Sequence, residues 1–101
     1  MNDKIPQKEE VLTRLKSYKK PLKKKYGVIK IGIFGSVARG EASNLSDVDI
    51  VLEMEQPHLF KMVHIKNELE ELLCLKVDLV RYRKSMNPFL KKRIDRDACY
   101  A

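Results

Sequence analysis

The first segment of the chain places apolar residues three and four positions apart, which is the spacing of one face of an α-helix. Lysines occupy the other faces, so the pattern predicts an amphipathic helix with a basic outer side. Pro21 lacks a backbone donor and crowds the turn before it, so we expect this helix to end, kink or restart there, with a break near residues 18–20. The apolar positions are Val11, Leu12, Leu15, Tyr18 and Leu22, and the basic positions are Lys16, Lys19, Lys20 and Lys23.

Three later segments have the pattern of β-strands. Residues 28–34 are β-branched and aromatic between two glycines, as in a buried strand, and Gly32 inside them suggests that another element approaches closely. Residues 48–53 and 75–81 alternate, so each of these strands has an apolar core face and a second face. Both second faces carry carboxylates.

Between and after these strands the chain favours helices. Pro57 suits a first helical turn, and an apolar stripe follows it that we expect to be core: Leu59, Met62, Ile65, Leu69, Leu72 and Leu73. Residues 89–100 are weakly helical and strongly basic. With a short helix after Gly35, the order is helix, strand, helix, strand, helix, strand, helix. This order predicts one α/β (α+β) domain over residues 1–101, with a three-stranded sheet flanked by helices, whose strand directions the periodicity leaves open.

The 101-residue chain has a formal net charge of +7, and that charge is unevenly distributed. Residues 31–80 hold four basic and nine acidic side chains, so an acidic block lies inside a basic protein. No apolar run approaches the roughly 18 residues that span a bilayer, and the first ten residues lack the apolar core of a signal peptide. We therefore expect a cytoplasmic protein that does not enter a membrane.

Two basic clusters flank the acidic block. Residues 19–25 could attract RNA, nucleotide or an acidic protein, but no aromatic stacking platform is interleaved with them. A solvated helix face is the favoured interpretation, and direct nucleic-acid binding is not favoured. The second cluster could draw a triphosphate to the acidic block or hold an acidic partner, and both remain open. It consists of Arg81, Arg83, Lys84, Lys91, Lys92 and Arg93.

The segment from Gly35 to Gly40 follows a predicted strand directly and opens a short helix. Gly35 permits a tight turn and close approach of a ligand, while the first amides of the helix and the Ser36 hydroxyl point forward. Arg39 lies three residues after Ser36 on the same helix face and could add donors to a phosphate. The segment indicates an anion site, although an ordinary strand-to-helix connection has the same pattern.

Asp47 and Asp49 stand two positions apart, so both carboxylates project to one side of their strand. They repel each other unless a cation lies between them, and magnesium prefers such oxygen ligands. The alternative is a turn residue at Asp47 and a solvated carboxylate at Asp49. If the third strand lies beside the second, Asp78 joins them. Three carboxylates before a phosphate-binding turn favour metal-assisted nucleotidyl transfer, in which one ion activates a hydroxyl and another shields the leaving pyrophosphate.

The string Gly-Ser-x-x-Arg-Gly, five residues, then Ser-Asp-x-Asp-x-x-Leu resembles the signature of the polymerase-β-like nucleotidyltransferase superfamily. The short chain resembles its minimal nucleotidyltransferase (MNT) members, and the resemblance covers residues 26–81. It implies a mixed sheet flanked by helices and a site for ATP and two magnesium ions. The implied nucleotide-binding residues are Gly35, Ser36, Arg39 and Ser46, and the implied catalytic and metal-binding residues are Asp47, Asp49 and Asp78.

The same resemblance implies a partner. Many MNT proteins of this size resemble antitoxins that silence a HEPN ribonuclease toxin by transferring AMP from ATP to one of its tyrosines. It therefore implies a type VII-like antitoxin that is a magnesium-dependent protein adenylyltransferase. Two alternatives stay open: transfer to a small molecule such as an aminoglycoside, and a non-catalytic antitoxin that binds its toxin. The sequence also leaves homo-oligomerisation open.

Overall fold

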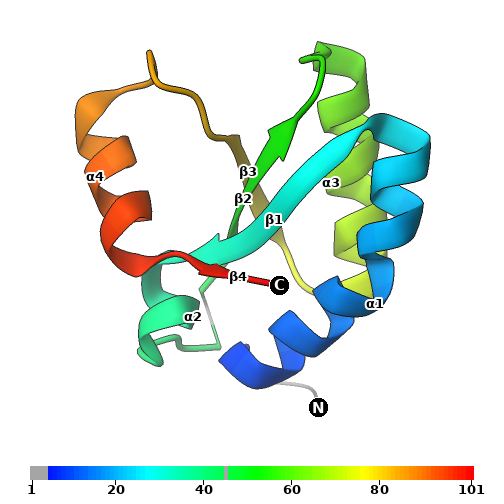
Figure 1. Cartoon of the computed structure of the whole chain (residues 1–101). Helices are drawn as coiled ribbons and strands as arrows, with labels where there is room; N and C mark the ends of the chain where they lie inside the picture. The colour runs from blue at the N-terminus through cyan, green and yellow to red at the C-terminus, as the bar shows by residue number, and fades with distance from the viewer. Residues whose placement is uncertain (1–4, 45) are drawn as a thin grey trace.

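The computed structural model describes residues 5–44 and 46–101 and folds them around one mixed sheet, shown in Figure 1. The strand order is β3-β2-β1-β4, with β2 parallel to β3 and antiparallel to β1, which is antiparallel to β4. No helix in the described ranges is long and apolar enough to cross a membrane. The elements are α1 (Lys8–Tyr26), β1 (Val28–Phe34), α2 (Gly35–Arg39), β2 (Val48–Met54), α3 (Leu59–Leu73), β3 (Val77–Arg81), α4 (Pro88–Asp97) and β4 (Cys99–Tyr100).

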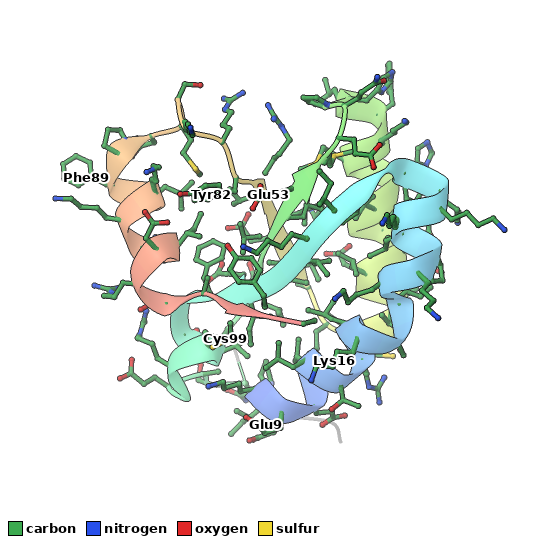
Figure 2. All side chains as sticks on the ribbon, in the orientation of Figure 1. Glu9, Lys16, Glu53, Tyr82, Phe89 and Cys99 are labelled. Carbon is green, nitrogen blue, oxygen red and sulfur yellow. The ribbon has the colours of Figure 1, made fainter. Side chains whose placement is uncertain are left out.

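The two faces of the sheet bury separate apolar clusters. Helices α1 and α3 cover one face, where Ile50 and Leu52 belong to the larger cluster, while α4 lies across the other face (Figure 1). Val51, which alternates with them along β2, belongs instead to the smaller cluster with Ile94 of α4. Tyr82 lies between α4 and the sheet (Figure 2), where its hydroxyl donates to Asp95 at 2.9 Å. The alternation along β2 therefore assigns its odd-numbered residues to the face that α4 covers.

Helix α1 runs without a break from Lys8 to Tyr26, so the predicted interruption near residues 18–20 is wrong. A proline inside a helix costs about 3 kcal/mol because it removes one hydrogen bond and crowds the preceding turn. Leu15 and Leu22 lie on either side of Pro21 and are fully buried. Burying each leucine contributes about 2 kcal/mol, which offsets the cost of the proline.

Helix α3 begins at Leu59 rather than at Pro57, and its predicted stripe is only partly core. Ile65, Leu69 and Leu73 are buried, whereas Leu59 is 77% exposed. The first turn of α3 therefore contributes little to the core, because only the later turns pack against the sheet and α1. The third strand is also shorter than predicted, since it begins at Val77.

A fourth strand replaces the last part of the helix expected over residues 89–100. Helix α4 ends at Asp97, and β4 pairs with Gly32 and Ile33 of β1. A Cβ added at Gly32 would lie 2.5 Å from the Cys99 carbonyl oxygen, so the close approach expected at this glycine is confirmed. The sheet thus has four strands, whereas the sequence predicted three. The fourth was missed because a strand of two residues is too short to show a periodic pattern.

Candidate nucleotidyl-transfer site

The register of β2 and β3 brings two of the predicted carboxylates together. Asp49 and Asp78 are paired residues of these parallel strands. Neighbouring strands lie about 4.8 Å apart, and paired residues project to the same face of the sheet. Asp49 shares that face with Val51, so both carboxylates lie on the side covered by α4.

Asp47 approaches the same place from the loop before β2. It stands one residue before the first residue of the strand and is exposed. Burial raises the pKa of the Asp49 carboxyl, and the negative charges of Asp78 and Asp47 raise it further. Both aspartates are therefore close enough to disfavour a negative charge on Asp49, as expected for carboxylates that share one site.

Gly35 forms the turn that faces this cluster. Its φ is +72°, a left-handed backbone conformation that residues with a side chain rarely adopt, and a Cβ at this position would collide with Asp49 Oδ2. A glycine is thus required twice, once for the backbone angle and once for the space. The strand-to-helix turn consequently lies directly against the Asp49 carboxylate.

The two serines of the predicted site each accept a hydrogen bond from a backbone N–H, one at either end of the connection between α2 and β2. The Ser36 carbonyl accepts the Glu41 N–H at 2.9 Å, which closes the end of α2. The Ser46 hydroxyl accepts the Ser43 N–H at 2.9 Å and so orders the turn before Asp47. Their roles in nucleotide binding stay predictions.

Arg39 makes ion pairs with carboxylates of this chain. Its guanidinium donates to Glu41 at 2.8 Å and to Asp97 at 2.7 Å, which ties α2 to the end of α4. Hydrogen bonds from Arg96 and then from Arg39 lower the pKa of Asp97 to about 2. Arg39 also helps to lower the pKa of Asp49 against the stronger effect of burial, so it contributes positive charge to the site. Phosphate binding by Arg39 stays a prediction.

Arg93 joins the candidate site, although the sequence did not single it out from the second basic cluster. Its guanidinium carbon lies 6.0 Å from the centre of the Phe34 ring, and Phe34 is the partner of Asp49 on β1. Among the positive groups that lower the pKa of Asp49, Arg93 has the largest effect. In the sequence, only its position next to the apolar residue Ile94 indicated that Arg93 lies near the sheet. Its approach to Asp49 could not be predicted, because that depends on how α4 packs.

The carboxylates fit a divalent cation by their chemistry. Within residues 5–44 and 46–101, no three His, Cys, Asp or Glu side chains already form a metal-ligand cluster. Asp49 is nevertheless destabilised as an anion by both Asp78 and Asp47, and a cation between them would relieve that repulsion. Carboxylate oxygens are the ligands that magnesium takes together with substrate phosphates.

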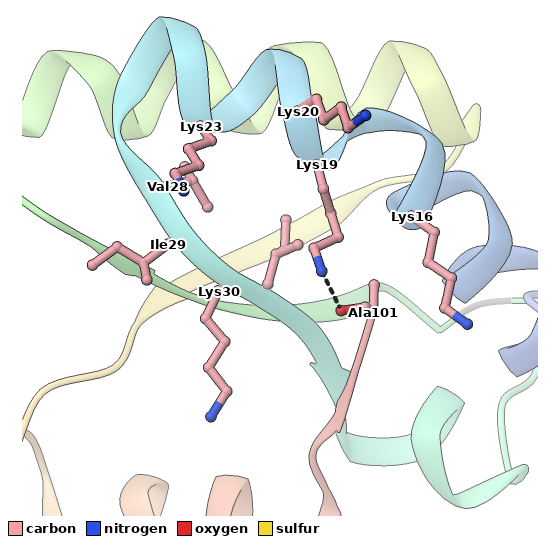
Figure 3. Close-up of a pocket in the computed structure, with 9 residues that line it drawn as sticks. Lys16, Lys19, Lys20, Lys23, Val28, Ile29, Lys30 and Ala101 are labelled. Atoms are coloured by element: carbon pink, nitrogen blue, oxygen red, sulfur yellow. Dashed lines mark hydrogen bonds between the residues drawn. The ribbon is translucent and has the colours of Figure 1, made fainter.

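Another basic surface lies away from this site, between α1 and β1. Figure 3 shows its groove, of about 490 Å³, in which Lys19 donates to the Ala101 carbonyl at 3.0 Å. The groove contains none of the predicted site residues. Its lysines are Lys16, Lys19, Lys20, Lys23 and Lys30.

Known proteins are similar to this chain in sequence and in fold. The nucleotidyltransferase domain family matches residues 15–99. The chain is 42% identical over 93 residues to protein adenylyltransferase MntA of Thermococcus cleftensis, spanning 91% of this chain and 93% of that protein. It is similar to a solved structure assigned as a minimal nucleotidyltransferase, with 32% identity, a TM-score of 0.74 and coverage of 92% and 94%.

One solved complex shares the fold at lower identity. A chain from the complex of tri-AMPylated Shewanella oneidensis HEPN toxin with MNT antitoxin is 18% identical, with a TM-score of 0.65 and coverage of 89% of this chain and 70% of that one. Together these likenesses confirm the predicted nucleotidyltransferase fold, with its mixed sheet flanked by helices.

Proposed function

Because the chain belongs to the nucleotidyltransferase domain family and is a nucleotidyltransferase, we propose that it adenylylates a protein. The proposed reaction transfers AMP from ATP to a tyrosine of a cognate HEPN ribonuclease toxin, with magnesium, and so neutralises the toxin. The relative named protein adenylyltransferase MntA supports the reaction, and the fold shared with the HEPN–MNT complex supports the partner. A reaction that consumes ATP also favours a cytoplasmic location.

The observation that carries this proposal is the pairing of Asp49 with Asp78 directly in front of the Gly35 turn. Asp47 and Asp49 would hold the magnesium ions, with Asp78 completing the ligand set. When bound, magnesium neutralises charge on the triphosphate and acts as a Lewis acid. Gly35 and Ser36 would hold the triphosphate, since the turn allows a ligand to approach the backbone closely.

The chain's own residues account for the proton and the charge in the transfer. The acceptor hydroxyl oxygen forms a bond to the α-phosphorus of ATP, the bond from that phosphorus to the bridging oxygen breaks, and pyrophosphate leaves. Asp78 accepts the hydroxyl proton, because it is the partner of Asp49 on β3 and is exposed to an incoming acceptor. Arg93 would place a positive charge where negative charge develops.

The test is to incubate the protein with ATP, magnesium and the HEPN-domain protein of the same genome, and then to weigh that protein. We expect the mass to rise by one or more AMP units with the wild type and with Glu55→Ala, an exposed control. We expect no gain with Asp47→Ala. Equal mass in all three reactions would refute adenylyl transfer to this partner. Toxin neutralised without any AMP would instead support an antitoxin that acts by binding alone.

A further inference from the structure

A groove of about 550 Å³ follows the outer edge of β3 between the start of α3 and the start of α4. Leu79 and Val80 both line it, although neighbouring residues of a strand project to opposite faces. The groove therefore opens along the edge of the strand. One wall includes Leu59 and Met62, and the other includes Met86 and Leu90.

The floor of this groove is an open sheet edge. The Lys76 carbonyl accepts the Val48 N–H, and the Tyr82 N–H donates to the Leu52 carbonyl. The N–H and C=O groups of the even-numbered residues from 76 to 82 therefore point toward β2. The groups of Leu79 and Arg81 therefore face outward. Val77 N–H, which shares that direction, is bound by Glu70 at 2.9 Å. In the described part of the chain, β3 is an edge strand: β2 pairs with its inner side, and no strand pairs with the outer side to which these groups point.

The groove combines apolar walls with positive charge. Leu59, on the α3 wall, is 77% exposed, and neighbouring Phe60 is 70% exposed. Exposed apolar side chains gathered in this way mark interaction sites. Arg83 lines the groove as well, and among the residues that the structure describes no acidic side chain does. An occupant that suits it has apolar side chains and a nearby carboxylate.

We propose that an extended apolar segment of the protein substrate, with an acidic residue beside it, binds here as an added strand along β3 and carries the acceptor hydroxyl to Asp78. The proposal rests on the adenylyl transfer proposed above. Added strands of this kind gain affinity from main-chain hydrogen bonds and specificity from alternate side chains. The open N–H and C=O groups of Leu79 and Arg81 supply the hydrogen bonds.

The position of Asp78 explains why docking at this edge serves the reaction. Asp78 comes directly before Leu79, so an added strand that pairs with Leu79 and Arg81 also passes Asp78. A residue opposite Asp78 projects to the same face of the sheet, with its Cβ about 5 Å away. A tyrosine there has its hydroxyl above Asp78 and Asp49. The edge of β3 thus holds the acceptor segment next to the candidate site.

A second copy of the chain fits the edge less well, because joining two copies through this groove would bring their Arg81 and Arg83 side chains together. The occupant is therefore another protein. Size-exclusion chromatography with light scattering on the chain alone tests this point. A dimer that Arg81→Pro dissociates would overturn the proposal.

The central experiment compares Arg81→Pro with Arg81→Ala in adenylyl transfer to the HEPN-domain protein. Proline removes an outward N–H at the last residue of β3 and leaves the ladder to β2 in place, whereas alanine keeps the N–H. We expect Arg81→Pro to raise KM for the protein substrate about tenfold, as for one lost hydrogen bond, with kcat and ATP affinity unchanged. Arg81→Ala keeps the N–H and removes one positive charge from the groove, so it should raise KM clearly less than Arg81→Pro does, by about threefold.

Two further measurements keep the outcome clear. Leu59→Ser, at an exposed position, should also raise KM and leave the fold unchanged. Amide hydrogen exchange at Leu79 and Arg81 should slow in the complex. Docking on β3 is wrong if the wild type transfers AMP while Arg81→Pro and Leu59→Ser keep the wild-type KM, or if these amides are unprotected in the complex. The proposed adenylyl transfer would be unaffected by either result. If the wild type transfers no AMP, the proposed function itself fails.

Discussion

Asp49 and Asp78 occupy paired positions on two parallel strands, so the register of β2 and β3 decides whether the two carboxylates meet. A shift of β3 by one residue would turn Asp78 to the face covered by α1 and α3. The core fixes the register, because Val77 is buried on that face and alternates with Asp78. The same apolar pattern that builds the sheet therefore places the carboxylates.

Gly35→Ala should abolish transfer, while Gly40→Ala should preserve it. Both glycines have positive φ, so alanine costs about 1–2 kcal/mol of backbone strain at either position. Only at Gly35 does the added Cβ collide with Asp49, whereas nothing lies within 4 Å of one at Gly40. AMP transfer and melting temperature measured on both variants would separate strain from collision. An active Gly35→Ala variant would show that the turn does not need to lie against Asp49.

Asp49→Asn should remove activity without destabilising the fold in metal-free buffer. Since the pKa of Asp49 is raised on folding, the folded chain binds this proton more tightly than the unfolded chain. The stability that the protonated carboxyl contributes is complete below its unfolded pKa and is lost as pH rises through its folded pKa. At neutral pH the variant should melt at the wild-type temperature or up to about 5 °C above it, and this gain should vanish near about pH 3. A clear fall in melting temperature would give Asp49 a structural role.

Glu68→Gln should destabilise the protein in a pH-dependent way. Burial raises the pKa of Glu68, but hydrogen bonds from Tyr18, Tyr26 and Lys25 outweigh it and bring the pKa to about 2. The carboxylate joins α3 to both ends of the α1 segment that contains Pro21. We expect the free energy of unfolding to fall by about 1 kcal/mol and the melting temperature by about 5 °C at neutral pH.

The sign of the Glu68 effect follows from its lowered pKa. The stabilisation is present above the unfolded pKa and is lost as pH falls toward about 2, so the variant and the wild type should converge in acid. Glu71→Gln is the matched control, because this glutamate lies exposed on the same helix. If the difference in melting temperature between Glu68→Gln and the wild type stays constant across the pH range, the charge of the Glu68 carboxylate does not stabilise the fold.

Much of the site could be predicted because its parts are local in sequence. The glycine turn and the Asp47–Asp49 pair each lie within a few residues, and alternation gives the facing of Asp78. Their convergence needed β3 to lie beside β2, which the structure shows. Arg93 could not be predicted, because its distance from Asp49 depends on the packing of α4 against a separate apolar cluster.

The fold could be predicted to the level of its repeating patterns. The strand at residues 28–34 was right to the residue, because glycines bound it on both sides. Pro21 misled because local preference was outweighed by the burial of Leu15 and Leu22. The short strand β4 was missed because its only sequence trace is Gly32, which lies about 70 residues away in the chain.

The central claim is that these aspartates bind ATP through a divalent cation, and titration calorimetry of ATP binding tests it most directly. The three carboxylates and a triphosphate are all negatively charged and repel one another, so we predict binding with magnesium and a loss of at least about 100-fold in affinity when the metal is chelated. Asp78→Asn should weaken binding in magnesium but leave the protein folded. Equal ATP affinity with and without magnesium would contradict the account.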